Sequence, residues 1–324
     1  MVYVHRVASI PCLLIDKKEI ITVADEAASN GDTVVSSAKG GKTPLRLRLA
    51  LGLDNFLKAA KFYQIASCWD ECSKCYIKAG TIQLERSKNQ RSLEVSAACF
   101  FALAGEARNK YSNVNDAKKF FIKAIKICST LQEFGACAQL EHKLAERLCD
   151  IGQHEEAVHH FCRAAIMYDK QPEFKSVSSF CLLQAGHILG EMEQFQDAAT
   201  MFIQAADKDI YENLTKLNTK DYLFKASLLF LAAESKAPKE SFHGTKAIQL
   251  GEKYHQLDGQ YWFTAECRFV RNVIQSCKEC NIDLFADHVY FFHEVNPLDP
   301  WTLRLLGILR IYIENNNRQK NEGD

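Results

Sequence analysis

Four segments of the chain superpose without gaps, and this repeat limits the possible folds more than any other feature. Each segment has an acid, then a small residue, an aromatic residue four positions later and an alanine three positions beyond it. The segments span residues 71–79, 116–124, 156–164 and 197–205. Their small residues occupy positions 72, 117, 157 and 198, so the intervals are 45, 40 and 41 residues. Periods of this length are typical of solenoids built from stacked helical units.

The spacing within each segment has a physical explanation. Residues i, i+4 and i+7 lie on one face of a helix. Small residues at both ends of this face let a neighbouring helix approach, and the aromatic residues fill the space between layers; they are Tyr76, Phe121, Phe161 and Phe202. Partner helices are predicted at 92–111, 134–149 and 176–189, which gives helical hairpins longer than tetratricopeptide repeats. An irregular helical bundle, the alternative, does not predict a repeated spacing.

Composition supports a helical chain and excludes some functions. The 324 residues include only 15 glycines and 6 prolines, which favours helices over sandwiches or barrels and predicts few tight turns. The 40 basic and 40 acidic residues cancel, so there is no bulk attraction to nucleic acid. No apolar run is long enough to span a bilayer and no secretory leader is recognised. The 13 cysteines then indicate reduced thiols in a cytoplasmic protein.

The sequence predicts four regions. Residues 1–50 form an N-terminal helix, over 17–28, and a flexible loop; residues 51–235 form the repeats; residues 236–314 form a C-terminal helical bundle; and residues 315–324 form a polar, frayed tail. The loop at 30–43 carries Val34 and Val35 near lysines, which fits either a plain linker or contact with an anionic membrane surface. The apolar helix after Pro300 is expected to cover the open end of the solenoid.

Two groups of cysteine and histidine residues have spacings that suggest a metal site. The first could supply thiolates to an iron–sulfur cluster, and comprises Cys68, Cys72 and Cys75. The second resembles a zinc motif with too short a central spacer, and comprises Cys277, Cys280, His288 and His293. The first group crosses a helix start and includes a packing position of the repeat, so buried thiols explain it better. The neighbouring residues His159 and His160 are a further candidate pair of metal ligands, for which an ordinary structural role is again the alternative.

No catalytic or nucleotide-binding motif is present in the sequence. The run from Gly40 to Thr43 ends like a phosphate-binding loop, but Ser36 occupies the position of that motif's first glycine. We therefore predict a protein that is not an enzyme and that has no metal or cofactor.

The chain resembles the soluble N-ethylmaleimide-sensitive-factor attachment proteins, the SNAP family, and its α/β branch more than its γ branch. The resemblance runs from about residue 53 to 311. It depends on the four repeats and on the runs GEMEQF at 190–195, KDYLFKA at 220–226, ECR at 266–268 and LDPW at 298–301.

This resemblance implies a twisted α-solenoid of tetratricopeptide-like hairpins with a C-terminal helical bundle. It also implies an adaptor that binds assembled, syntaxin-type SNARE four-helix bundles and recruits the hexameric AAA+ ATPase of the NSF type for their disassembly in vesicle fusion and membrane trafficking. Such docking is electrostatic and multivalent. A helical-repeat scaffold with changed partners is the alternative, and a metal or redox enzyme is a third hypothesis that elemental analysis would test.

The resemblance also assigns residues to surfaces. On the SNARE-facing side, glutamines stand where lysine is common and nearby bases could substitute; the set is Gln139, Gln184, Lys143, Arg163 and Lys175. The ATPase-facing acids are Asp221, Glu279 and Asp283. Gln275 and Lys278 occupy positions where acids are usual.

The resemblance makes two further assignments at the ends of the chain. Val34 and Val35 match the family's membrane-contacting loop, where larger apolar residues are usual, and imply weak, peripheral membrane association. The chain ends in Asn-Glu-Gly-Asp and lacks the family's terminal leucine.

Overall fold

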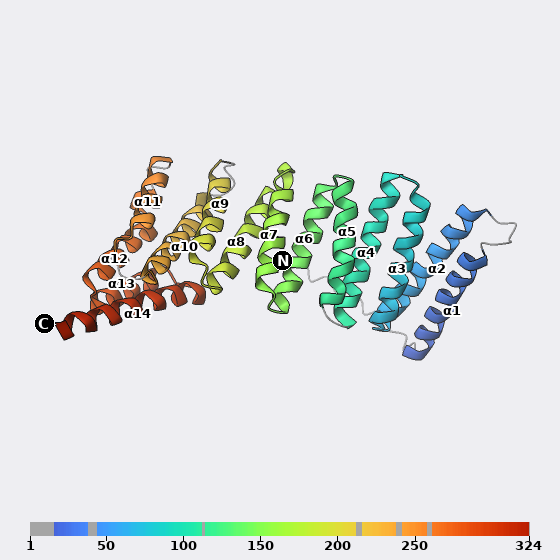
Figure 1. Ribbon diagram of the computed structural model, residues 1–324, viewed down its shortest axis with the longest axis horizontal. Helices are drawn as coiled ribbons and strands as arrows, with labels where there is room; N and C mark the ends of the chain where they lie inside the picture. The colour runs from blue at the N-terminus through green and yellow to red at the C-terminus, as the bar shows by residue number, and fades with distance from the viewer. Residues whose placement is uncertain are drawn as a thin grey trace, which may run out of the picture. The chain divides into compact units, whose positions relative to one another are not determined.

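Helices and the loops that join them make up the protein in the computed structural model, which describes residues 16–37, 44–111, 114–211, 216–237, 242–257 and 261–323 (Figure 1). No strand occurs in these ranges. The chain divides into two compact units, Met1–Leu140 and Glu141–Asp324. The expected all-α fold of stacked helical hairpins is confirmed, whereas the division into four regions stays a prediction.

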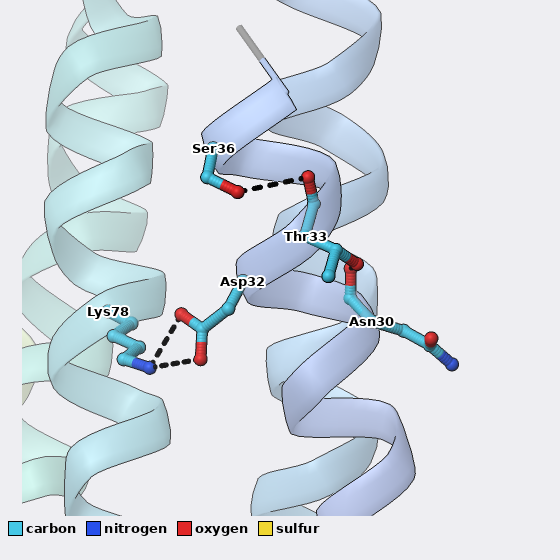
Figure 2. A network of polar contacts seen from close by, with 5 residues as sticks. All are labelled: Asn30, Asp32, Thr33, Ser36 and Lys78. Carbon is cyan, nitrogen blue, oxygen red and sulfur yellow. Dashed lines mark hydrogen bonds and ion pairs between the residues drawn. The ribbon is translucent and has the colours of Figure 1, made fainter.

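The first unit is a series of antiparallel helices. They are α1 (Lys17–Ser36), α2 (Leu45–Ile65), α3 (Trp69–Ser87), α4 (Arg91–Tyr111) and α5 (Val114–Thr130), followed by α6 (Phe134–Asp150), which crosses the boundary between the units. From α1 to α5, each helix packs on the next in the chain. Figure 2 shows how α1 also reaches α3: both carboxylate oxygens of Asp32 lie 2.7 Å from the ammonium nitrogen of Lys78.

The second unit continues with hairpins and ends in a bundle. Its helices are α7 (His154–Tyr168), η2 (Pro172–Phe174), α8 (Lys175–Glu191), α9 (Phe195–Tyr211), α10 (Lys216–Ser235), α11 (Thr245–Leu257), η3 (Tyr261–Phe263), α12 (Ala265–Glu279), α13 (Ile282–Val295) and α14 (Pro300–Gly323). Helices α7 to α10 pack in chain order. Helix α10 then contacts α11, α12 and α14, so it is the centre of the C-terminal bundle.

The repeat positions lie where the sequence predicts them. The four aromatic side chains are at most 8% exposed, and the small residues on both sides of them are at most 1% exposed. The predicted partner helices correspond to α4, α6 and α8. In two repeats the aromatic ring lies over a glycine of the preceding helix: a Cβ atom at Gly105 would be 3.0 Å from Phe121, and one at Gly186 would be 2.9 Å from Phe202.

The turns between helices are tight, contrary to the expectation from the low glycine content. Among the described residues, six connections of at most three residues contain a residue with positive φ, namely Ser67, Lys88, Gln132, Gly152, Glu193 and Cys280. In five of them the next backbone N–H donates to a carbonyl five residues earlier, as Cys68 does to Tyr63 and Gln194 does to Leu189, the pattern of a Schellman motif. This turn satisfies the helix-end carbonyls, and only one of the six uses glycine, so few glycines do not mean few turns.

Two expectations about the ends of the chain are wrong. Residues 30–36 are not a loop, because α1 continues to Ser36. Gly31, which belongs to the expected loop, lies inside the helix, where a Cβ atom would be 2.9 Å from the ring of Phe56. Similarly, α14 runs through the polar segment to Gly323. The run from Gly40 to Thr43 lies outside the described residues.

Candidate protein-binding surfaces

The bases and glutamines expected to face a SNARE bundle come from three helices. Gln139 and Lys143 are exposed one turn apart on α6, with Gln139 in the first unit and Lys143 in the second. Arg163 lies on α7, Lys175 begins α8 and Gln184 lies further along α8, and all three are half-buried. The second unit therefore brings Lys143, Arg163, Lys175 and Gln184 to successive helices, but they differ in how their side chains are engaged.

Arg163 is committed to an internal carboxylate. The side chain of Glu141 is fully buried, and its Oε2 lies 2.5 Å from Nδ1 of His160. The guanidinium of Arg163 forms an ion pair with Oε1 at 2.8 Å. A buried carboxylate needs such compensation because desolvation penalises its charge. The sequence treats Arg163 as a surface base, whereas the structure makes it the counter-ion of Glu141.

Gln184 lies beside acids as well as bases. It lines a shallow hollow of about 340 Å³ together with Glu146, Arg147 and Asp150, and Arg147 is paired with Asp150 at 2.9 Å. The hollow therefore has mixed charge, and replacing the usual lysine by glutamine removes a positive charge from it.

A basic stripe on α5 was not among the predicted surfaces. Lys119, Lys123 and Lys126 are all exposed, and their i, i+4, i+7 spacing places them on one helix face. Lys123 also lies over the ring of Phe101, with 3.8 Å from nitrogen to ring centroid, and Lys119 contacts Asp116 at 3.4 Å. The spacing is visible in the sequence, because each lysine follows a buried residue of the same repeat by two positions.

The acid Asp221 belongs to a cluster around one lysine. The ammonium of Lys225 lies 3.2 Å from Asp221, one turn away on α10, and 3.3 Å from Asp299, just before α14. Lys225 is 12% exposed, whereas both acids are about half exposed. Despite partial burial, the hydrogen bonds from Thr302 and then the charge of Lys225 hold the pKa of Asp299 below its usual value.

Glu279 and Asp283 lie on either side of the turn between α12 and α13, and both are exposed. The side-chain amide of Gln275 donates to Glu279. Asp283 lies in the first turn of α13, where a negative charge interacts favourably with the helix dipole. The short turn therefore brings these two acids to one corner of the bundle, whereas Asp221 lies on a different helix.

An exposed apolar surface near Asp283 was also not predicted. A groove of about 550 Å³ is lined by residues of α13 and α14, including Asp283, Val289, Tyr290 and Leu303. Next to it, Phe291 and Val295 are 67% and 78% exposed. The sequence predicts that the apolar residues of the last helix close the solenoid, which holds for Leu305, Leu306 and Leu309, all at most 3% exposed.

The four sequence runs that carry the resemblance meet in the second unit. Lys220 is 2.9 Å from Glu266, which joins the runs at 220–226 and 266–268. Lys225 joins the first of these to Asp299. Trp301 covers Gly190, where a Cβ atom would be 2.6 Å from the indole, and its Nε1 donates to the carbonyl of His187 at 3.3 Å. The runs therefore hold the bundle together.

The described cysteines and histidines do not gather into a metal-binding group. Among the residues that the structure describes, no group of three or more metal-binding side chains is found. Burial raises the pKa of the Cys72 and Cys277 thiols to about 12, so they stay protonated. His288 contacts Ser276 at 3.2 Å, and His293 accepts from the N–H of Leu298 at 3.1 Å, so they are engaged separately.

Val34 and Val35 lie in the last turns of α1, and both are half-buried. Val35 packs towards Gly52 of α2, where a Cβ atom would collide with its Cγ2. Their expected contact with a membrane stays a prediction. No helix in the described part of the chain is long and apolar enough to cross a bilayer.

The sequence is similar to one family of proteins along most of its length. The profile of the family described as "Soluble NSF attachment protein, SNAP" matches residues 16–314. Human alpha-soluble NSF attachment protein is 25% identical over 292 residues, covering 89% of this chain and 91% of that protein. The bovine beta protein is 23% identical over 89% of this chain and 90% of its own length. A fowlpox virus homologue, FPV011, is 22% identical over 82% and 90%. The chain therefore belongs to the soluble NSF attachment protein family.

Proposed function

We propose that this protein is an adaptor that binds assembled SNARE four-helix bundles and recruits an NSF-type AAA+ ATPase to them. The family is one of non-enzymatic attachment proteins. The observation that supports the proposal most strongly is the family match across residues 16–314. In this role the protein acts in the cytoplasm and contacts membranes peripherally.

The SNARE-facing surface is best supported on α5 of the first unit, where Lys119, Lys123 and Lys126 form an exposed basic stripe. In the second unit, Lys143 is a separate exposed base on α6. Lys175 is a further candidate at the start of α8, whereas Arg163 is already the counter-ion of Glu141. The stripe offers the positive charge that the glutamines at 139 and 184 do not supply, since an acidic helical bundle needs only a complementary charge pattern to dock.

The ATPase-facing surface is proposed to include Asp221, Glu279 and Asp283. Glu279 and Asp283 have exposed carboxylates, whereas that of Asp221 is about half exposed and shares Lys225 with Asp299. A basic partner surface would compete with Lys225 for these two acids. Attraction between exposed charges is screened beyond about 8 Å at physiological ionic strength, so both docking steps should weaken as salt is raised.

Membrane contact, the third expected interaction, is better supported on α2 than on α1. Leu45, Leu47 and Leu51 are each about half exposed near the start of α2, with the exposed Arg46 among them. Apolar side chains beside a base are suited to the interface of an anionic membrane. In that case Val34 and Val35 would not touch the membrane themselves but would pack between α1 and α2 and hold α2 in place.

A reconstituted pull-down tests the adaptor function. We expect the ATPase to be retained on an immobilised SNARE bundle only when this protein is present. The variant K119Q/K123Q/K126Q should lose binding to the bundle, while D221N/E279Q/D283N should keep it and lose the ATPase. Controls are K58Q/K61Q for the bases and E85Q/E252Q for the acids, because these exposed side chains lie on other helices than the residues tested.

The outcome also decides between the adaptor and a scaffold with changed partners. If the unmodified protein retains neither the bundle nor the ATPase, the scaffold hypothesis replaces the adaptor. If the control variants lose as much binding as the test variants, the assigned surfaces are wrong while the function stands.

A further inference from the structure

The C-terminal bundle contains a pocket that the adaptor function does not use. It has a volume of about 280 Å³ and is formed by α10, α11, η3 and α12. Its walls are largely apolar and include Ile248, Trp262, Val270 and Ile274. Its volume is close to the lower end of the range for small-molecule sites, about 300 to 1,000 Å³. The pocket is therefore suited to a small ligand with an apolar body.

The inner wall of the pocket carries no charge. Ser227, Tyr261 and Cys267 line it and are at most 6% exposed. The hydroxyl of Ser227 donates to the carbonyl of Leu223, which satisfies it inside α10. Burial raises the pKa of the Tyr261 phenol and of the Cys267 thiol, so both stay neutral. A charged group would be penalised here, whereas an apolar group would not.

Two cationic residues also line the pocket, Arg271 and Lys278, two turns apart on α12. The guanidinium of Arg271 lies 4.7 Å from the ring centroid of Trp262, and its Nη2 donates to the carbonyl of Trp262 at 3.3 Å. This fixes its position at the pocket. Within the described residues, neither cation has a carboxylate at ion-pair distance. Lys278 is exposed.

Gln275, between the two cations along α12, completes the polar lining and is also exposed. Its amide donates to Glu279, which is not a lining residue. Gln275 and Lys278 are the two positions at which the resemblance leads us to expect acids. With acids there, the lining would repel an anion; with glutamine and lysine it attracts one.

We propose that this pocket binds a small amphipathic anion, whose apolar group lies against Ile248, Trp262 and Ile274 and whose carboxylate or phosphate is bound by Arg271 and Lys278. The apolar group of the ligand matches the apolar wall of the pocket, and its negative charge matches the two cations. Charge-assisted hydrogen bonds to these cations fix the orientation of the ligand and exclude neutral or cationic molecules of the same shape. The site is additional to the adaptor function, and Gln275 and Lys278 at its rim border Glu279 of the proposed ATPase-facing surface.

Isothermal titration of the full chain tests the proposal with octanoate and octyl phosphate, each below its micellar concentration. We expect saturable binding of at least one, and the tighter probe identifies the preferred head group. Octanol, octylammonium and acetate, which lack the negative charge or the apolar group, should bind at least about tenfold more weakly, the effect of losing one charge-assisted contact.

Three variants and one matched control locate the site. K278Q and R271Q should each weaken binding about tenfold, and I248W should abolish it by filling the pocket. R268Q is the control, because Arg268 is exposed on the same helix but does not line the pocket. Circular dichroism checks that each variant is folded, and the exposed position of Lys278 makes K278Q the variant least able to disturb the fold.

Several results would overturn the proposal. These are the absence of saturable binding by either anion, equal binding of octanol or octylammonium, or equal weakening by R268Q and K278Q. Capture of an acidic peptide without binding of either small anion would assign the pocket to a protein partner instead. None of these results bears on the pull-down that tests the adaptor, so the two proposals can fail separately.

Discussion

The buried carboxylate of Glu141 shows how a single residue can change the interpretation of its neighbours. Because Glu141 is fully buried, His160 and Arg163 are needed to compensate its charge. Replacing Arg163 would therefore affect the stability of the fold as well as any binding surface. Removing one partner of a buried ion pair leaves an uncompensated charge. The sequence places these three residues on two predicted helices but does not show that they meet.

We expect R163Q to lower the free energy of unfolding. A fully buried pair would lose about 3–5 kcal/mol; because 41% of the Arg163 side chain is exposed and His160 remains, we expect about 2 kcal/mol. Urea unfolding measures the change. K143Q, on the exposed face of α6, should stay within about 0.5 kcal/mol of the parent. Equal stability of R163Q and the parent would mean that Glu141 does not need this guanidinium.

His187 gives a pH-dependent prediction. Its ring lies 4.7 Å from that of Trp301 and 5.1 Å from that of Phe202. Burial, and secondarily the charge of Lys225, lowers its pKa below the ordinary 6.5. The unfolded chain therefore binds a proton at a higher pH than the folded one. Stability from this residue is complete above about pH 6.5 and falls as the pH drops towards the lowered folded pKa.

Thermal melts between pH 7 and pH 5 test this linkage. The melting temperature of the parent should fall over this window, and H187Q should fall less steeply. H159Q is the control, because His159 is exposed, and it should keep the parental slope. Parallel curves for H187Q and the parent would show that His187 does not cause the dependence.

At the scale of helices, packing between neighbours depends on pairs that are separated in sequence. Gly105 and Phe121 are 16 residues apart, as are Gly186 and Phe202, and each pair joins adjacent helices through contact of ring and backbone. The same offset places the fully buried Ala145 before Phe161. This second regularity was present in the sequence, but the structure was needed to show that the two positions touch.

Two helical glycines should respond to alanine in opposite ways. At Gly307 on α14 no atom lies within 4 Å of the place that a Cβ atom would occupy, so G307A should stabilise the helix by up to about 1 kcal/mol through its better helix propensity. At Gly190 a Cβ atom would lie 2.6 Å from Trp301, so G190A should destabilise. Urea unfolding of both variants gives the comparison, and a loss of stability in G307A would contradict the open space at that position.

At the scale of the whole chain, the two units contain their own cores, and the second depends on its last helix. Helix α14 contributes buried side chains that include Leu305, Leu309 and Ile313, each at most 2% exposed. They belong to the same core as residues of α10 and α12. The end of the chain is therefore part of the fold up to Ile313, and more polar beyond it.

Two truncations test this dependence. A chain that ends at Val295 should lose amide protection in α10 and α12, because their apolar surfaces would be exposed to water. Protection in α2 and α3 of the first unit should remain. A chain that ends at Asn316 should keep protection throughout, since the last core residue precedes the cut. Hydrogen exchange measures both, and unchanged protection in the shorter chain would show that α14 is dispensable.

The sequence by itself determined the helical hairpins, the buried face of each repeat and the family, because these depend on local periodicity and on the order of short runs. Tertiary structure alone decided which side chains are available for binding. It paired Arg163 with Glu141, placed Lys225 between Asp221 and Asp299, buried Gly31 inside α1 and set Arg271 beside an apolar pocket. The physical reason is that helix formation is governed by neighbours three and four residues apart, whereas charge compensation and cavities depend on residues that only folding brings together.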